Sequence, residues 1–258
     1  MNDYAVGIPT RDRPELLAKT LEAFAAQTQP PGLIFVIDNN TGAGPDVSAA
    51  SQAFICDNEF GVAGPEQAHQ TALRWMAKAG VPVGVRWDDD LVPEPDCMER
   101  LVRHIAAGNA EAAGGCYPRD RADWPVWPGG PRGGAPIPDG HAGHAQFFRW
   151  AAAGEPVPPA AEVRHLYSGF AYRVGAANDC GGFCTGYTQL GYRAETDLSL
   201  RIGRCLVEPS AVAVHHCAPG GVRSIAAADY ERMAAADASL FAARMTERGI
   251  DIEGGYWQ

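Results

Sequence analysis

The sequence has 258 residues, 46% of them hydrophobic and 20% charged, with a formal net charge of −10 at pH 7. This composition suits a globular domain with a sizeable core and excludes a largely disordered chain. The negative charge argues against broad duplex-DNA binding, which depends on phosphate neutralisation. Because the sequence has no run of about 18 apolar residues and no basic-then-apolar N-terminus, we expect a cytoplasmic protein without a membrane span.

The first part of the chain predicts a strand–helix–strand unit. Residues 4–9 form an apolar strand, a helix begins at Pro14, and residues 33–37 form a second strand that ends in Asp38 and Asn39. Such a unit implies parallel pairing and a right-handed crossover. Ligands bind at the carboxyl ends of strands in open α/β sheets. Asp38 is therefore either an acceptor for a ribose or base, or a turn residue.

A third strand, residues 53–56, leads to a loop that contains Asn58 and then to a helix that opens at Pro65. The loop holds several glycines, but it matches neither a Walker loop nor the G-x-G-x-x-G fingerprint. A P-loop or dinucleotide site is therefore not expected.

The most informative stretch is a short apolar strand, residues 83–87, followed by Asp88, Asp89 and Asp90. In an extended segment alternate side chains share a face, so Asp88 and Asp90 should point one way and Asp89 the other. Two oxygen donors with open coordination positions suit Mg²⁺ or Mn²⁺ holding a diphosphate. The alternative is a solvated acidic turn that caps the helix near residue 95.

The second half of the chain continues the α/β pattern with one interruption. We expect a helix over 95–107, a strand over 111–117, a Gly/Pro-rich lid or insertion over 118–159, and a strand over 165–173. A helix from Ala194 carries Glu195 and Asp197 in its first turn, where acids either suit the helix dipole or face a cleft as general base and orienting group. A strand ending in His215 and His216 follows.

The C-terminal stretch, residues 224–248, predicts a helix capped by Ser224 and stopped at Gly249. Its apolar residues are spread in a way that favours docking on the core or a dimer contact over membrane attachment.

In this order the motifs resemble the family 2, GT-A type glycosyltransferases. The resemblance covers about residues 4 to 216, without the insertion, and rests on residues 7–14, 36–39, 86–90, 181–183 and 195–201 before a strand that ends in histidine. It departs from the family pattern in two places. At the base position, where the family usually has two acidic residues, this sequence has Ala194-Glu195. The two adjacent histidines, His215 and His216, also leave open which of them would bind the metal.

The resemblance implies a nucleotide-diphosphate sugar donor, UDP-sugar favoured, and Mn²⁺ or Mg²⁺. It places the metal at Asp90 and Asp88 with His215 or His216, and the base at Glu195, with Asp197 as the second catalytic candidate. The expected donor-binding residues are Pro9, Thr10, Arg11, Arg13, Asp38, Asn39, Asn58, Trp87, Asp88 and Asp89. The acceptor-side candidates are Trp124, Trp127, Tyr172, Arg173 and Gly182.

We therefore expect a GT-A-like, Rossmann-related α/β/α sandwich with a mostly parallel sheet. Residues 1–220 would form the catalytic domain, with a 118–160 insertion, and 221–258 a C-terminal helical extension that supports a possible homodimer. The predicted reaction moves a sugar to an acceptor hydroxyl, with inversion; the acceptor could be a natural product, glycan, protein or modified nucleobase.

Three alternatives stay open at this point. They are a non-catalytic nucleotide-sugar-binding module, a nucleotidyltransferase, and a structural zinc protein. The zinc site would use Cys180, Cys184, His215, His216 and Cys217, although the odd count of seven cysteines otherwise indicates reduced thiols.

Overall fold

A computed structural model describes residues 4–39, 42, 44–61, 64–117, 159–166, 168–216 and 225–252. Its strands are β1 (Tyr4–Thr10), β2 (Leu33–Asp38), β3 (Ala53–Asp57), β4 (Val83–Arg86), β5 (Leu91–Pro93), β6 (Ala112–Cys116), β7 (Ala161–Val163), β8 (Phe170–Arg173) and β9 (Cys205–His215). Its helices are α1 (Pro14–Ala25), α2 (Pro65–Lys78), α3 (Cys97–Ala106), α5 (Val174–Asp179), α6 (Ala194–Ile202) and α7 (Ala227–Glu247).

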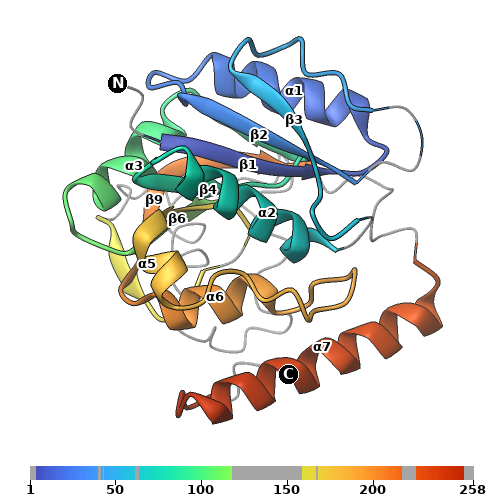
Figure 1. Ribbon diagram of the computed structural model, residues 1–258. Helices are drawn as coiled ribbons and strands as arrows, with labels where there is room; N and C mark the ends of the chain where they lie inside the picture. The colour runs from blue at the N-terminus through green and yellow to red at the C-terminus, as the bar shows by residue number, and fades with distance from the viewer. Residues whose placement is uncertain are drawn as a thin grey trace, which may run out of the picture.

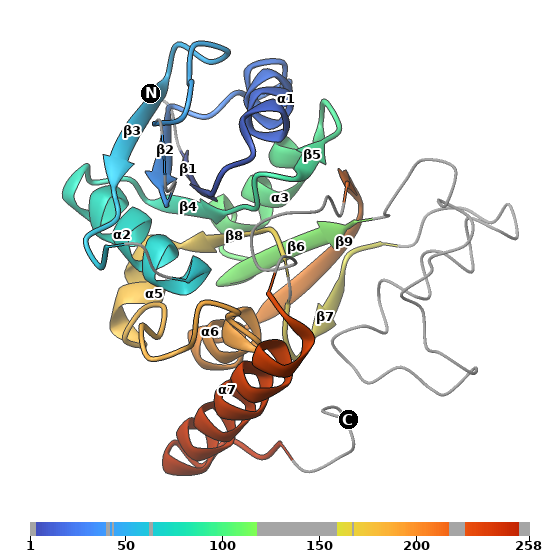
Figure 2. The ribbon, with the colours of Figure 1, turned by 90° about the vertical axis from the view of Figure 1, so that its right-hand side faces the viewer.

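The strands form one sheet in the order β3-β2-β1-β4-β8-β6-β9-β5, with β7 also paired to β9. Figure 1 shows β3, β2, β1 and β4 in this sheet, and Figure 2 also labels β5, β7 and β8. The first four strands are parallel, as the strand–helix–strand pattern predicts. β8, however, runs antiparallel between β4 and β6, and β5 and β7 pair antiparallel with β9. The expectation of a mostly parallel sheet is thus only partly confirmed, because it holds for one half of the sheet.

The sheet lies between two helical layers, which confirms the expected α/β/α sandwich. α1 and α3 cover one face, and α2, α5 and α6 cover the other (Figure 2). Side chains of β1 alternate between the two cores: Tyr4, Val6 and Ile8 face the first, and Ala5 faces the second. A Cβ on Gly7 would lie 2.5 Å from the Cβ of Ala72, so glycine at this position lets α2 pack closely on β1.

The C-terminal helix α7 lies along one end of the molecule, next to α6 (Figure 1). It contributes Phe241 and Met245 to a small third cluster with Tyr187 and Ala194. None of the helices in the described ranges is long and apolar enough to span a membrane. Trp124, Trp127, Cys217, Ser224 and the core of the expected insertion lie outside the described residues.

Candidate active site

The acidic stretch after β4 forms a turn, whereas alternation of its side chains would require an extended segment. The strand ends at Arg86, the amide of Leu91 donates to the carbonyl of Asp88 at 3.3 Å, and β5 begins at Leu91. Trp87 is completely buried between Phe24 and Tyr117, and its indole donates to the carbonyl of Leu91 at 2.6 Å. The prediction that Trp87 binds the donor is therefore wrong, because this side chain belongs to the core.

Asp89 is the buried member of the acidic stretch. Its carboxylate accepts a hydrogen bond from the hydroxyl of Thr10 at 2.9 Å and pairs with the guanidinium of Arg13. Burial raises the pKa of Asp89 to about 7, against the opposing effect of Arg13. The expectation that Asp89 contacts the donor is corrected, since the side chain is fully enclosed. Thr10 and Arg13, also expected at the donor, use their polar groups within the protein in this structure.

Asp90 lies beside a histidine from the other half of the sheet. Its Oδ1 is 3.3 Å from Nε2 of His215, and its Oδ2 is 3.0 Å from a guanidinium nitrogen of Arg13. The antiparallel pairing of β5 with β9 brings these residues together, because Leu91 is in register with His215. The next residue, His216, donates its backbone amide to the carbonyl of Asp90 at 2.9 Å and has an exposed side chain. The structure therefore favours His215 over His216 as a ligand.

Asp90 and His215 together present one carboxylate oxygen and one imidazole nitrogen. This donor pair fits a divalent cation that keeps open positions for phosphate oxygens and water. Within the described ranges no group of three or more His, Cys, Asp or Glu side chains could enclose a metal ion. Cys217, one of the residues of the zinc alternative, lies outside the described residues. Asp88, whose side chain is 27% exposed, is the most open acid of the turn.

The carboxyl ends of the first three strands lie side by side next to this turn. Thr10 is in register with Asp38, and Asp38 with Asp57. Asp38, the expected nucleoside contact, is half-buried at the end of β2. Half-buried Pro9 precedes Thr10 on β1, and Arg11 reaches Gln189 at 3.4 Å in the loop before α6.

Asn39 and Asn58 were also expected at the donor, but their amide groups bond to each other. The Asn58 amide nitrogen donates to the Asn39 amide oxygen at 2.8 Å, and the Asn58 oxygen accepts from the hydroxyl of Thr71 at 3.1 Å. Both asparagines are buried. Their observed role is to join the loops after β2 and β3 to helix α2.

Glu195 lies in the first turn of α6, within electrostatic range of the acidic turn. Burial raises the pKa of Glu195, and Asp88 raises it further, while Arg86 and Arg193 oppose this shift. The side chain is half-buried. A partly desolvated carboxylate with a raised pKa is a chemically suitable general base, and this role of Glu195 stays a prediction.

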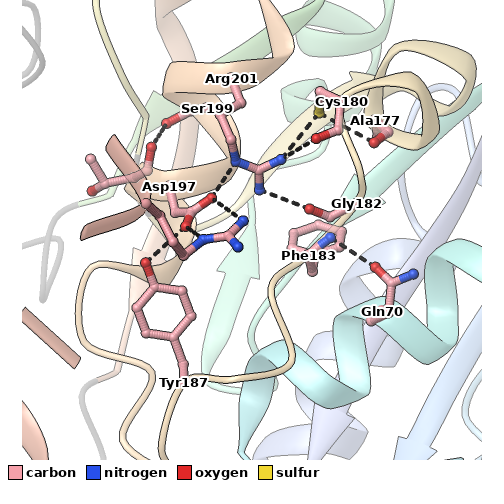
Figure 3. A network of polar contacts seen from close by, with 11 residues as sticks. Gln70, Ala177, Cys180, Gly182, Phe183, Tyr187, Asp197, Ser199 and Arg201 are labelled. Atoms are coloured by element: carbon pink, nitrogen blue, oxygen red, sulfur yellow. Dashed lines mark hydrogen bonds and ion pairs between the residues drawn. The ribbon is translucent and has the colours of Figure 1, made fainter. Parts of the chain in front are cut away.

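Asp197 has a different environment, and its expected catalytic role is corrected. The residue is completely buried, and its carboxylate pairs with Arg201, with Arg244 of α7 at 2.5 Å and with the hydroxyl of Tyr187 at 2.9 Å (Figure 3). Arg201 in turn donates to the carbonyls of Cys180 and Gly182. Asp197 thus fastens α7 and the loop before α6 to the domain.

The sequence matches the profile of Glycosyl transferase family 2 over residues 5–157. The chain belongs to glycosyl transferase family 2. The match covers the first six strands and ends before β7. The later elements β8, α6 and β9 lie outside the matched region, so their positions are known from the structure only. A comparison with curated proteins finds no match.

Solved structures share the GT-A fold of this family 2 chain at low sequence identity. One is the mannosyltransferase PcManGT from Pyrobaculum calidifontis in complex with GDP-Man and Mn²⁺, with a TM-score of 0.60 and 18% identity over 95% of this chain and 64% of that one. Another is S. aureus TarS 1-349 in complex with UDP-GlcNAc, with a TM-score of 0.64 and 15% identity over 94% of this chain and 66% of that one. The chain thus spans slightly less than two thirds of either relative.

Of the acceptor-side candidates of this family 2 chain, the structure describes three, and these do not gather at the site. Tyr172 is buried and its hydroxyl contacts the sulfur of Met76, so it is a core residue. Arg173 pairs with Glu111 at 2.7 Å and is in register with Val83, at the opposite end of β4 from the acidic turn. Their expected roles toward an acceptor stay predictions. Gly182 packs against Gln70, and its carbonyl accepts a hydrogen bond from Arg201 (Figure 3). In this structure it belongs to the loop between α5 and α6.

Two charged residues at the site were not singled out from the sequence. Arg86, at the end of β4, is buried and pairs with Glu66 of α2 at 3.0 Å. A cation at the end of an otherwise apolar strand is the signal that could have identified it. Glu66 gave no comparable signal, because an acid in the first turn of a helix is ordinary.

Proposed function

We propose that this family 2 domain transfers a sugar from a nucleotide-diphosphate sugar to an acceptor hydroxyl, with the help of Mn²⁺ or Mg²⁺. The observation that carries the proposal is the contact of Asp90 with His215 at 3.3 Å, beside the carboxyl ends of β1 and β2. Two side chains with suitable donor atoms, from distant parts of the chain, meet where α/β sheets bind nucleotides. PcManGT, whose structure contains GDP-Man and Mn²⁺, supports a metal of this kind.

Asp90 and His215 would hold the cation, and Asp88 would face the ribose or the sugar. The bound cation would neutralise the negative charge that develops on the departing diphosphate. Arg13, which pairs with Asp90 in this structure at 3.0 Å, holds the carboxylate in place from the other side. Asp38 and Arg11 at the ends of β2 and β1 would contact the nucleoside and the phosphates.

Glu195 would act as the general base. The acceptor oxygen attacks the anomeric carbon, its proton passes to the Glu195 carboxylate, and the bond to the diphosphate breaks with the electron pair leaving on the phosphate oxygen. A single displacement of this kind inverts the anomeric configuration. A UDP-sugar is the donor to test first; TarS, whose structure contains UDP-GlcNAc, and PcManGT, with GDP-Man, support testing both nucleotides.

The acceptor is expected to be a natural product, a glycan, a protein or a modified nucleobase. Homodimer formation through the C-terminal helix, and the division at residue 220 into catalytic domain and extension, stay predictions. Asp237 and Arg244 nevertheless bind α7 to the loop before α6 and to α6 itself. We therefore propose that the extension folds as part of the catalytic unit.

The test of the base is the Glu195→Gln variant. Removing the base should lower kcat for sugar transfer by about 10²- to 10⁴-fold and leave donor affinity unchanged. Glu111→Gln, at the opposite end of the sheet, is the matched control and should keep normal activity. Near-normal transfer by Glu195→Gln, with donor binding intact, would refute the role of Glu195.

A further inference from the structure

Arg86 is a single buried cation among three carboxylates. One guanidinium nitrogen donates to Glu66 at 3.0 Å, and the other lies 3.5 Å from Asp88. Its charge also acts on Glu195. Arg86 therefore stands between α2, the acidic turn and α6, the three elements that converge on the proposed site.

The backbone around Arg86 fixes the guanidinium in place. Nη1 donates to the carbonyl of Ser168 at 2.5 Å, and Ser168 has a φ of +55°, a conformation that non-glycine residues rarely adopt. The neighbouring Gly169 is so close to Trp87 that a Cβ would lie 2.4 Å from the ring. Because β4 and β8 pair in register here, with Arg86 opposite Phe170, the guanidinium has little freedom to move.

Charges from the acidic turn, from β4 and from the start of α6 act on Glu195. Asp88 on the acidic turn raises its pKa, as does burial, while Arg86 on β4 and Arg193 at the start of α6 lower it. Glu195 and Asp88 in turn raise the pKa of Glu66 on α2. Without Arg86, three carboxylates would repel one another across the site, and Glu195 would hold its proton to higher pH.

We propose that Arg86 is a positioning residue of the transfer site, which orients Asp88 and holds a fixed positive charge between α2 and the acidic turn. The inference rests on the proposed function, in which Glu195 is the base. It adds Arg86 as a residue that acts on the reaction through Asp88 and Glu195. The planar fork of arginine suits this role because it can engage Glu66, Ser168 and Asp88 at the same time.

The decisive comparison is between Glu66→Gln and Glu66→Gln/Arg86→Met. The shared Glu66→Gln change avoids leaving a buried carboxylate unpaired, so the two proteins differ only in the arginine. The titration of Glu195 is followed by NMR of protein labelled with ¹³C at glutamate carboxyls and assigned with Glu195→Gln. We expect the loss of Arg86 to raise the pKa of Glu195, because the nearby positive charge favours the ionised carboxylate. An unchanged pKa would overturn the proposal.

Three further variants sharpen the comparison. Arg86→Lys keeps the charge without the fork, so Glu195 should titrate near its wild-type pH while kcat falls. Arg86→Gln, which retains a donor for the Ser168 carbonyl, replaces the Met variant if that protein does not fold. Glu162→Gln/Arg204→Met removes an exposed ion pair elsewhere and should leave Glu195 unaffected. A shift of the same size in this control would contradict a specific role for Arg86.

Kinetics provide the readout that a purely structural role would not change. The acid limb of the kcat–pH profile should move to higher pH in Glu66→Gln/Arg86→Met relative to Glu66→Gln, in step with the NMR titration. The titration itself needs no substrate. A wild-type protein that turned over no donor would refute the proposed function, whereas the carboxyl titration would still decide the role of Arg86.

Discussion

Two acids near the start of α6 have opposite roles. Glu195 is half-buried near the acidic turn, whereas Asp197 is enclosed by Arg201, Arg244 and Tyr187. From the sequence the two carboxylates were equivalent candidates, because both lie in the first turn of the helix. The distinction depends on α7, which contributes Arg244 from far along the chain, and no local pattern indicates that contact.

We expect Asp197→Asn to destabilise the fold. The substitution leaves two guanidinium groups short of a carboxylate, one of them on the almost completely buried Arg201, and should lower the free energy of unfolding by about 3–5 kcal/mol. Urea denaturation measures this change. Asp229→Asn, which breaks an exposed pair with Arg232 on α7, is the control and should cost less than about 1 kcal/mol. An unchanged urea midpoint for Asp197→Asn would contradict the structural role.

The buried carboxyl of Glu66 should make stability depend on pH. Burial raises its pKa from 4.5 to about 7, so the folded state holds a proton that the unfolded chain has already lost in this window. The stabilisation is complete below about pH 4.5 and is lost as the pH rises through 7. Between pH 5 and pH 8 the free energy of unfolding of the wild-type protein should therefore fall by up to about 3 kcal/mol more than that of Glu66→Gln. Denaturation at the two pH values measures this difference. The same pH dependence of the free energy of unfolding in both proteins would contradict the raised pKa of Glu66.

At the scale of elements, the loop of residues 184–193 depends on α7 for its shape. The buried carboxylate of Asp237 accepts hydrogen bonds from the amide and hydroxyl of Thr188, at 2.7 and 2.9 Å, and from the amide of Tyr192 at 2.9 Å. Through Gln189 the same loop reaches Arg11 at the end of β1. α7 therefore supports one wall of the proposed site.

Asp237→Ala should loosen this loop without unfolding the domain. Leaving the Thr188 and Tyr192 amides unpaired costs about 1–3 kcal/mol, and their hydrogen exchange should accelerate while amides of β1 and β2 stay protected. Hydrogen exchange read by mass spectrometry measures both regions. Asp229→Ala, on an exposed part of α7, should change neither. Uniform acceleration across the sheet would instead indicate global destabilisation.

The elements that the sequence predicted are those with long, regular patterns. The parallel half of the sheet, α1, α2, α3 and α7 follow from hydrophobic periodicity and from prolines at helix starts. β5 and β7 were missed because three-residue strands carry too little periodicity to detect. The antiparallel insertion of β8 was missed because no strand–helix–strand unit determines its direction, and β8 covers only the last four residues of the predicted 165–173 strand.

At the scale of the whole molecule, the site depends on these missed elements. The acids of the turn and Glu195 were found in the sequence because polar residues at strand ends and helix starts are recognisable. The choice of His215 over His216 required the β5–β9 register, and the exclusion of Trp87 and Asp89 required their burial. The sequence thus indicates the region of the proposed site, and long-range pairing determines which side chains lie next to one another there.

The most direct test of the proposed function is calorimetry of UDP- and GDP-sugars with and without Mn²⁺. We expect one donor to bind only with the metal, and Asp90→Asn and His215→Ala to weaken that binding by about tenfold or more. His216→Ala is the matched control, with an exposed side chain next in sequence, and should bind normally. Metal-independent binding, or equal affinities in His215→Ala and His216→Ala, would contradict a metal site built on Asp90 and His215.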